Sequence, residues 1–368
     1  MSQVTMLLTN GFDPDVRVYK EAKYLISQGH SVSILCWDRE ESYYYPKYEI
    51  MDGVEIIRFR IISELGSGMK QLPAFLAYIK ECRNYLKTHP CDYLHCNDID
   101  GAITGYLARH RKTPMVFDMH EFYETGSDTK RWIWRQLTLF LLKRSIAGIY
   151  ENRVYLEKPY RAVHDKLYML KNYPDSNLVQ PRPKSSSEIF RIGYHGAVRG
   201  QLSEFTALFE AVKDMTDVRV DINGGGTDLR KLKELEKNYS NVHVHGVFDG
   251  TAVLSGLYEN TDILFCGYDP EVPNHQGDAE AVKFYEAIFT GTPMLMTRGI
   301  GMGDKVEKFG FGLTCNTRDP KEIREAVVRL KTDHELWEKC HTNELEHAGE
   351  YCWDTAVTIL DKIYRKEN

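Results

Sequence analysis

The stretch Ala281-Val282-Lys283-Phe284-Tyr285-Glu286-Ala287-Ile288-Phe289-Thr290-Gly291-Thr292-Pro293-Met294-Leu295 predicts a helix that ends in a turn and leads into an apolar strand. Apolar residues recur at helical spacing, which predicts that one face packs in a core: Phe284, Ile288 and Phe289. Gly291 ends the helix and Pro293 prevents its continuation. Lys283 and Glu286 lie three residues apart and therefore project from one face. This pairing fits either a weak surface ion pair or a site for a polyanionic, hydroxyl-rich ligand such as a nucleotide.

The composition indicates a folded protein of two domains. The chain has 368 residues, which is more than one compact core usually holds. Its 42% hydrophobic and 27% charged residues are typical of a soluble globular protein. Residues 1–170 hold 23 Lys and Arg against 21 Asp and Glu, whereas the remainder holds 24 against 32. Because no basic stripe runs along this acidic chain, nucleic-acid binding is not expected.

The eight cysteines predict a reducing compartment. None belongs to a Cys-x-x-Cys pair, and several lie in apolar, strand-like runs, a pattern typical of buried thiols in a cytosolic protein. Residues 1–8 lack a basic leader, so no signal peptide is expected, and no apolar stretch has the length of a membrane span. We therefore expect a cytoplasmic protein, at most peripheral on the inner face of a membrane.

Strand-like and helix-like segments alternate in two halves of the chain. In the first half the predicted strands are 4–8, 31–36, 54–62, 93–95 and 114–117, and the predicted helices are 16–28, 72–88 and 103–109. A Pro- and Ser-rich segment at 172–188 follows, after which strands are predicted at 190–194, 218–222, 242–244, 263–266 and 294–296. Such alternation predicts two doubly wound parallel sheets, with a cleft between the domains at the carboxyl ends of the strands.

The order of several short motifs resembles glycosyltransferase family 4, whose members have the GT-B fold of two Rossmann-like domains. The motifs are Asp15-Val16-Arg17-Val18-Tyr19-Lys20-Glu21-Ala22, Gly29-His30, His95-Cys96-Asn97-Asp98, Val116-Phe117-Asp118-Met119-His120-Glu121, Asn172-Tyr173-Pro174-Asp175, Gly196, Arg199-Gly200, Gly224-Gly225-Gly226 and the segment Lys283–Pro293. Each motif is a weak signal, but their order and spacing over nearly the whole chain are specific. The resemblance implies an α/β protein with an acceptor-side domain at 1–172, a linker at 173–188, a nucleotide-sugar donor domain at 189–350 and a C-terminal helix at 351–368 that crosses back to the first domain.

The resemblance also implies a donor site in the second domain. Glu286 matches the helix Glu of the family that accepts hydrogen bonds from ribose hydroxyls. The second acid of the family, eight positions earlier, falls on Asp278, where Asp replaces the usual Glu; it is either a contact to the transferred sugar or a solvated loop residue. Arg199 and the backbone N–H groups at Gly196 are implied to bind the diphosphate, with Lys283 in place of the usual second cation; the alternative for Arg199 is an ordinary surface charge.

A glycine turn follows one of the predicted strands of the second domain. A dinucleotide-binding fingerprint would require a further glycine where this chain has Leu229, so an NAD site is not expected. We expect Gly225 and its neighbours to let the backbone pass close to the nucleotide. Phe248 is expected either to stack on the base or to pack in the core.

The first domain is implied to contribute His120 and Gly11. His120 follows a predicted strand, and the resemblance places it beside the reacting carbon of the donor sugar, where an imidazolium would ease the departure of phosphate. A buried histidine with satisfied hydrogen bonds is the alternative. Gly11 ends the first strand, where a glycine lets the backbone approach the donor or acceptor. Arg17 is a weaker candidate for binding the acceptor or a phosphate.

Two further segments each admit a functional and a structural interpretation. Asp98-Ile99-Asp100 has the Asp-x-Asp pattern of some metal sites, but its place in the first domain indicates acidic capping of a helix N-terminus. No His/Cys cluster has tetrahedral spacing either, so no metal is expected. The basic, Trp-containing segment 130–144 fits an amphipathic core helix or a helix at a membrane interface, which would imply a lipid-linked acceptor.

Together these expectations predict a retaining, metal-independent glycosyltransferase without a cofactor. It would move a hexosyl group from a nucleoside-diphosphate sugar to a hydroxyl of a glycan or lipid-linked acceptor, in polysaccharide or glycolipid biosynthesis. Retention is implied by the resemblance. Two alternatives stay open: a non-catalytic protein that binds sugar nucleotides or serves in assembly, and a sugar-nucleotide epimerase of the same fold.

Overall fold

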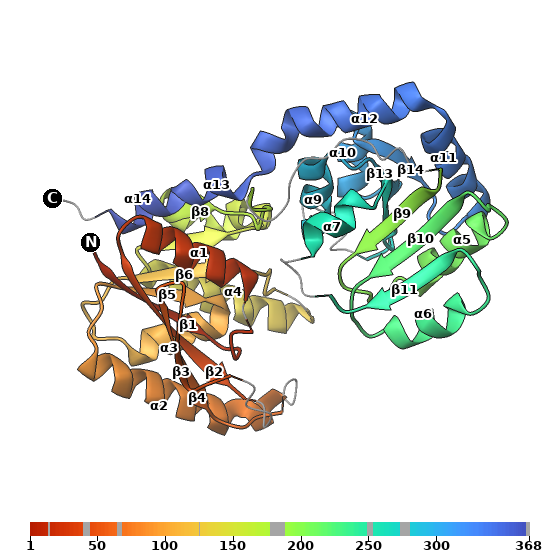
Figure 1. Ribbon diagram of the computed structural model, residues 1–368. Helices are drawn as coiled ribbons and strands as arrows, with labels where there is room; N and C mark the ends of the chain where they lie inside the picture. The colour runs from red at the N-terminus through yellow and green to blue at the C-terminus, as the bar shows by residue number, and fades with distance from the viewer. Residues whose placement is uncertain are drawn as a thin grey trace. The chain divides into compact units, whose positions relative to one another are not determined.

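The computed structural model describes residues 1–13, 15–39, 45–64, 68–124, 126–176, 188–248, 253–272 and 280–365. The chain forms two compact units (Figure 1). Met1–Asn172 and Val357–Asn368 make up the first unit, and Tyr173–Ala356 makes up the second. The chain therefore leaves the first unit once and returns to it near its C-terminus. All eight cysteines are free thiols.

An eight-stranded sheet forms the centre of the first unit. Its strand order is β3-β4-β2-β1-β5-β6-β7-β8, and only the pair β3–β4 is antiparallel. The strands are β1 Gln3–Leu8, β2 Ser31–Asp38, β3 Tyr48–Met51, β4 Val54–Arg60, β5 Tyr93–Asn97, β6 Met115–Met119, β7 Ala147–Tyr150 and β8 Leu167–Met169. Because β1 lies between β2 and β5, the winding reverses there, and the loops after these strands meet at the carboxyl edge of the sheet.

Helices cover both faces of this sheet (Figure 1). On one face α2 (Leu72–Thr88), α3 (Asp98–Ala108) and α4 (Asp128–Arg144) share a core with inward residues of β5 and β6, among them Leu94 and Phe117. Side chains alternate along a strand, so His95 and Asp118 point to the opposite face. There they meet α1 (Val16–Ser27) and α14 (Leu360–Tyr364). Short 3-10 turns complete the unit: η1 Gly68–Gln71, η2 Arg153–Leu156, η3 Lys158–Lys166 and η5 Val357–Ile359.

Helix α4, which covers the segment 130–144, is a core helix over most of its length. Its body supplies three buried residues, Thr138, Leu141 and Leu142, and four partly buried ones packed against the same core, Trp134, Leu137, Leu139 and Phe140. Near its N-terminus, however, Trp132 and Ile133 expose 59% and 51% of their surface. The structure therefore supports the core-helix interpretation for the body of α4 and leaves its N-terminal part exposed.

A six-stranded parallel sheet forms the centre of the second unit. Its order, β11-β10-β9-β12-β13-β14, is the 3-2-1-4-5-6 order of a doubly wound fold. The strands are β9 Phe190–His195, β10 Val218–Asn223, β11 Val242–Gly246, β12 Ile263–Cys266, β13 Met294–Thr297 and β14 Gly312–Cys315. The helices are α5 Leu202–Val212, α6 Leu229–Glu236, α7 Leu254–Glu259, α9 Val282–Thr290, α10 Gly301–Phe309, α11 Pro320–Thr332, α12 His334–His347 and α13 Trp353–Ala356, with a 3-10 turn η4 at Ala348–Tyr351.

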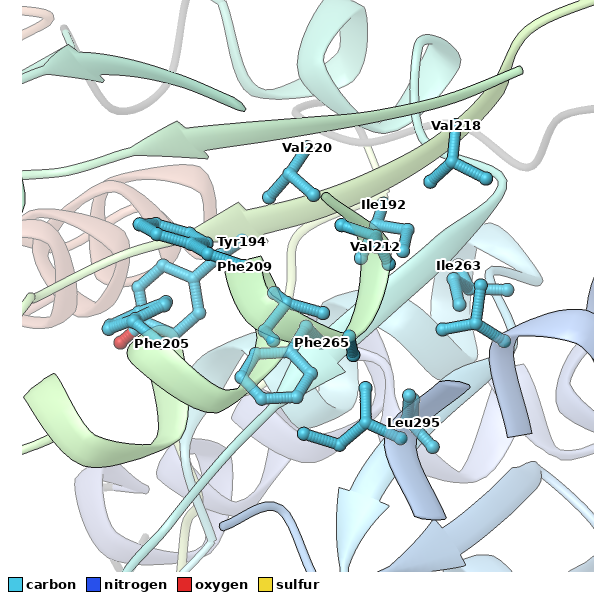
Figure 2. Close-up of a cluster of buried hydrophobic side chains, with 14 of the residues drawn as sticks. Ile192, Tyr194, Phe205, Phe209, Val212, Val218, Val220, Ile263, Phe265 and Leu295 are labelled. Atoms are coloured by element: carbon cyan, nitrogen blue, oxygen red, sulfur yellow. The ribbon is translucent and has the colours of Figure 1, made fainter. Parts of the chain in front are cut away.

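Two apolar clusters stabilise the second unit. Figure 2 shows side chains of the first cluster, which gathers residues of β9, β10, β12, β13 and α5: Ile192, Tyr194, Phe205, Phe209, Val220, Ile263, Phe265 and Leu295. The second cluster joins α9 to β12, β13 and α10 through Phe284, Ile288, Leu264, Met294 and Met302. The sheet is thus buried on both faces, as a parallel sheet requires.

The stretch 281–295 folds as its sequence predicts. Helix α9 ends at Thr290, and Gly291 caps it in the left-handed conformation with φ +67°. A Cβ at this position would lie 2.6 Å from the Nδ1 atom of His341, so packing as well as backbone conformation requires glycine. Strand β13 follows and pairs with β12.

The C-terminal segment differs from the continuous helix predicted at 351–368. Among the described residues it consists of the end of η4, α13, η5 and α14, and residues 351–356 belong to the second unit. The break coincides with β-branched residues, Thr355, Val357, Thr358 and Ile359, which lose side-chain freedom in a helix. Only the part from Val357 onward belongs to the first unit.

Candidate functional site

Glycine turns line the carboxyl edge of the second sheet and contact one another directly. The Gly196 N–H, after β9, donates to the carbonyl of Asn223 at 2.9 Å, and the Gly224 N–H donates to that of Gly246 at 2.7 Å. Gly224 has φ +150°, and a Cβ there would lie 1.8 Å from the Gly196 oxygen. Only glycine allows the turns after β9 and β10 to approach this closely.

The ammonium group of Lys283 lies beside the Gly196 turn. Lys283 is only 8% exposed, and its Nζ lies 3.5 Å from the centroid of the Tyr194 ring. A Cβ on Gly196 would come within 3.1 Å of Lys283 Cε and 3.2 Å of Nζ. Across the described parts of the chain, no carboxylate forms an ion pair with this ammonium group. Burial lowers the pKa of Lys283 to about 8. The turn therefore carries a buried cation without a paired anion, which suits an anionic ligand.

His195, the last residue of β9, was not singled out by the sequence analysis. Its Nε2 lies 3.0 Å from the Thr261 hydroxyl, and the Asn223 amide nitrogen lies 3.4 Å from its Nδ1. Burial, helped by the positive charge of Lys283, lowers the pKa of His195 to about 3. The imidazole is therefore neutral and does not add to the positive charge at the turn. The sequence signal that could have identified His195 is a polar residue at the end of a strand and directly before a glycine.

Glu286 lies one turn of α9 after Lys283. It is half-buried and accepts a hydrogen bond from the Tyr258 hydroxyl at 3.0 Å. Since Lys283 makes no ion pair with a described carboxylate, the interpretation of these two residues as a surface ion pair is wrong. The charge of Glu286 still partly opposes the effect of burial on the pKa of Lys283, so one helix face carries an acceptor and a cation that are not in ion-pair contact.

The structure places three other predicted donor residues along this edge. Gly225 accepts a hydrogen bond from the Val198 N–H at 2.8 Å, within the stacked turns. Arg199 is exposed on the turn that begins at Gly196 and has no ion pair with any residue in the described ranges. Phe248, after β11, packs partly buried against the cluster around α9.

Asp278, the predicted second acid, lies outside the described residues. The first acid after that gap is Glu280, which forms an ion pair with Lys305 and accepts a hydrogen bond from the Tyr285 hydroxyl. Glu280 is therefore held inside the second unit and does not stand in for Asp278 as a sugar contact.

In the first unit, His120 belongs to a buried ion-pair network. Asp118, at the end of β6, receives two hydrogen bonds from Arg17, Nη2 to Oδ1 at 2.8 Å and Nε to Oδ2 at 3.0 Å. His120 Nε2 lies 2.9 Å from the same Oδ2. Arg17 also donates to Glu151 Oε1 at 2.5 Å and to the Leu170 carbonyl at 3.0 Å. Arg17 is thus buried and fully engaged, and its assignment as an acceptor or phosphate ligand is wrong.

The network extends from Asp118 toward the C-terminus. His95 Nε2 lies 3.1 Å from Glu21 Oε2 and 3.7 Å from Asp118 Oδ2. His95 Nδ1 lies 2.6 Å from the hydroxyl oxygen of Tyr364. Glu21 in turn lies 3.2 Å from Arg17 Nε. These contacts join α1, β5, β6 and α14.

The charges of this network pair among its own members. It holds three basic side chains and four carboxylates, one of which, Asp98, lies at its exposed end: Arg17, His95, His120, Glu21, Asp118, Glu151 and Asp98. Burial alone would lower the pKa values of both imidazoles, but the neighbouring carboxylates outweigh it and raise each to about 9. Burial would raise the pKa of Asp118, but Arg17 and His120 hold it well below its usual range.

Three members of the network could be considered as metal ligands. Ligand atoms of Glu21, His95 and Asp118 lie within 4.8 Å of one another. A metal would require neutral His95 and free carboxylate lone pairs, whereas Arg17 occupies both oxygens of Asp118. The residues present therefore do not fit a metal site.

On its other side, His120 faces Asp98. Their Nδ1 and Oδ2 atoms are 3.5 Å apart, and the Tyr123 hydroxyl donates to Asp98 Oδ1 at 2.8 Å. Asp98 lies in the first turn of α3, as predicted, but its side chain makes no cap and its φ is +60°. His120 and Asp98 side chains are 14% and 36% exposed, so this end of the network reaches the surface of the unit.

Gly11 lies just beyond β1 at the same edge of the first sheet. Its carbonyl accepts a hydrogen bond from Arg58 Nε at 2.8 Å, and the Phe12 carbonyl accepts one from Arg58 Nη2 at 3.1 Å. A Cβ on Gly11 would lie 3.7 Å from Asp38 Oδ1, an ordinary contact. The buried Arg58 therefore fixes this loop, and its own packing does not require glycine at position 11.

Comparisons with known proteins match both units. Residues 14–149 match the model of the glycosyl transferase 4-like domain, and residues 189–333 match that of glycosyl transferases group 1. An uncharacterized glycosyltransferase of Methanocaldococcus jannaschii is 20% identical over 352 residues, which is 90% of this chain and 89% of that protein. Sucrose-phosphate synthase 1 of Arabidopsis thaliana is 34% identical over 79 residues, 21% of this chain, and the match spans only 8% of that relative's length.

Solved structures show the same fold. Sucrose-phosphate synthase from Thermosynechococcus elongatus has a TM-score of 0.75 at 16% identity, over 99% of this chain and 98% of that one. Anabaena HepE in complex with UDP and glucose has a TM-score of 0.69 at 15% identity over 100% of both chains. Since the two domain models together cover most of the sequence, the protein belongs to the GT-B glycosyltransferases, with a glycosyl transferase 4-like N-terminal domain and a group 1 C-terminal domain.

Proposed function

We propose that the protein is a retaining glycosyltransferase that moves a hexosyl group from a nucleoside-diphosphate sugar to a hydroxyl of a glycan or lipid-linked acceptor. The observation that carries the proposal is the buried ammonium group of Lys283 beside the Gly196 turn, with no paired carboxylate among the described residues. A diphosphate would supply the missing negative charge. The complex of the similar HepE with UDP and glucose supports this class of donor. Retention and a role in polysaccharide or glycolipid biosynthesis follow from the family resemblance.

In the proposed mechanism each group acts where its charge is needed. Lys283, Arg199 and the N–H groups of the turns stabilise the leaving diphosphate, on which negative charge develops. Glu286 accepts hydrogen bonds from the ribose hydroxyls. From the first domain, His120 acts as an imidazolium toward the donor sugar, with Asp118 holding its Nε2 proton. The mechanism uses no metal ion and no cofactor, and Asp278 is proposed as a contact to the transferred sugar.

The reaction itself can be tested by supplying UDP-, GDP-, ADP- and dTDP-sugars with glycan and lipid-linked acceptor fractions. We expect release of nucleoside diphosphate only with acceptor, and a product whose new linkage keeps the anomeric configuration of the donor, as read by NMR coupling constants. Isomerisation of the donor without an acceptor would instead show an epimerase. Tight donor binding without transfer or hydrolysis for every acceptor fraction would show a binding protein.

The donor site can be tested by calorimetry with the sugar nucleotide that binds the wild type. Lys283→Met and Glu286→Ala should each weaken binding about 10-fold or more, because each removes a charged hydrogen-bonding group. Lys308→Met, an exposed lysine on α10 of the same unit, is the matched control and should bind as the wild type does. Unchanged affinity in Lys283→Met would contradict the assignment.

Lys283 also predicts how donor binding depends on pH. Its pKa is lowered to about 8, so the ammonium form that attracts the diphosphate is lost as the pH rises above 8. Binding should therefore weaken between about pH 8 and 10 in the wild type. In Lys283→Met this weakening of binding at high pH should disappear. If the weakening persists in the variant, another group must cause it.

We further propose a peripheral contact with the inner face of a membrane through the segment 130–144. Trp132 and Ile133 are exposed near the N-terminus of α4, next to exposed Lys130 and Arg131. An aromatic and an aliphatic residue beside cations suit the headgroup region of an anionic bilayer. In the described residues, no helix has the length and apolar character to cross a membrane.

This contact can be tested by sedimentation with vesicles. The wild type should sediment with vesicles rich in phosphatidylglycerol and less with pure phosphatidylcholine, and added salt should reduce binding. Replacing Trp132 and Ile133 by Ser should abolish most of the binding to the phosphatidylglycerol-rich vesicles. The matched control is Leu107→Ser on α3, whose leucine is 46% exposed. Equal sedimentation of wild type and the Trp132/Ile133 variant would contradict the proposal.

A further inference from the structure

A chain of buried polar contacts runs from the last helix of the protein to His120. Tyr364 of α14 lies 2.6 Å from His95 Nδ1, across 269 positions of sequence. On the other side of the ring, His95 Nε2 faces Glu21 and Asp118, and Asp118 Oδ2 in turn lies 2.9 Å from His120 Nε2. Tyr364 is 2% exposed, and His95, Glu21 and Asp118 are fully buried, so water does not replace these contacts.

We propose that Tyr364 and His95 are positioning residues for His120, which act on it through Asp118. Neither residue reaches the surface that a substrate would contact, so neither is a catalytic residue itself. The importance of the positioning for sugar transfer rests on the proposed function. The physical coupling between the two histidines does not rest on the proposed function.

The coupling has a geometric basis at one oxygen atom. Asp118 Oδ2 accepts from Arg17 Nε at 3.0 Å, lies 2.9 Å from His120 Nε2, and lies 3.7 Å from His95 Nε2. Any rotation of the His95 ring therefore changes the surroundings of the atom that holds His120. The Tyr364 hydroxyl fixes that rotation at Nδ1, and the Tyr364 ring lies within 8° of the His95 plane. Tyr93 supports the Tyr364 ring edge-on at 5.1 Å.

The coupling also has an electrostatic basis. His95 is surrounded by the charged groups of Glu21, Asp118 and Arg17. His120 is surrounded by those of Asp118, Asp98 and Arg17, and Arg17 also contacts Glu151. Without the Tyr364 hydroxyl, an imidazolium at His95 would bury an N–H without a partner, which favours neutral His95. Asp118 would then face one cation fewer. Its attraction for the proton of His120 would increase.

Tyr364→Phe tests the coupling, because it keeps the ring and removes only the hydroxyl. The histidine ring protons are followed by NMR from about pH 5 to 10, and His120→Gln and His95→Gln assign the two signals. We expect the His120 pKa to rise by about 0.5 unit or more and the His95 pKa to fall. Asp118→Asn is the positive control and should lower the His120 pKa from about 9 toward the ordinary value.

The matched control is Tyr93→Phe, which removes a hydroxyl from the ring next to Tyr364 and outside the contact chain. It should leave both histidine titrations unchanged. An unchanged His120 titration in Tyr364→Phe, or an equal shift in Tyr93→Phe, would refute the coupling. If Tyr364→Phe does not fold, the wild-type titration tests the coupling between the two histidines. Coupled histidines give titration curves that both show the same two steps. Two independent single-step curves would refute the coupling.

Activity then separates positioning from simple packing. With an active donor and acceptor pair, Tyr364→Phe should lower kcat about 3- to 10-fold and change the donor KM by less than about twofold, because the nucleotide is held by the second unit. Tyr93→Phe should change neither. A shifted His120 titration with an unchanged kcat would refute the positioning role. If the wild type itself transfers no sugar, the proposed function fails, and the NMR titration still decides the coupling.

Discussion

The bidentate contact between Arg17 and Asp118 is the interaction on which the carboxyl edge of the first unit depends. Through Arg17 it joins α1 to β6, to Glu151 after β7 and to the Leu170 carbonyl after β8. A buried charge without a partner is unfavourable by several kcal/mol, so each of these elements must stay in place for the charges to remain paired. His120 is attached to the same carboxylate and shares its fixed position.

The two units use charge in opposite ways at equivalent edges of similar sheets. In the first unit, four carboxylates and three basic groups pair with one another, so the network holds side chains in place and has little capacity for a further anion. In the second unit, Lys283 is nearly as buried, yet faces an aromatic ring and a glycine turn in place of a carboxylate. A network of paired charges suits orientation, and a cation without an ion-pair partner suits the capture of an anion.

Close backbone packing explains how the second unit presents this cation. Gly224 and Gly196 touch through backbone atoms, and any side chain at Gly224 would collide with the Gly196 carbonyl. The turns after β9 and β10 therefore meet through backbone atoms, and the side chain of Val247, after β11, packs beside Gly225. Lys283, which reaches the turn from α9, lies where a Cβ on Gly196 would be in tight contact with it.

The local spacing of apolar residues in the sequence was sufficient to predict much of the architecture. Apolar spacing of period 2 and period 3.6 predicted most of the strands, though not β3, β7, β8 or β14, and it predicted that helix α9 ends at Gly291. The C-terminal helix at 351–368 was implied by the family resemblance, and the structure divides this segment into short helices and turns. Phe248, left open between base stacking and packing, lies partly buried against the α9 cluster. Burial of that kind depends on neighbours far away in the sequence.

The sequence by itself determined the doubly wound class, the glycine turns, the family and the identity of Lys283, Glu286 and His120 as candidates, because these depend on residue types and short spacings. Only the tertiary structure decided which charges are neutralised. Arg17, a candidate ligand in the sequence, meets Asp118 and Glu151 at separations of 101 and 134 residues, while Lys283 forms no ion pair with a described carboxylate. Whether a buried charge is paired depends on contacts between distant segments, and no local pattern encodes these contacts.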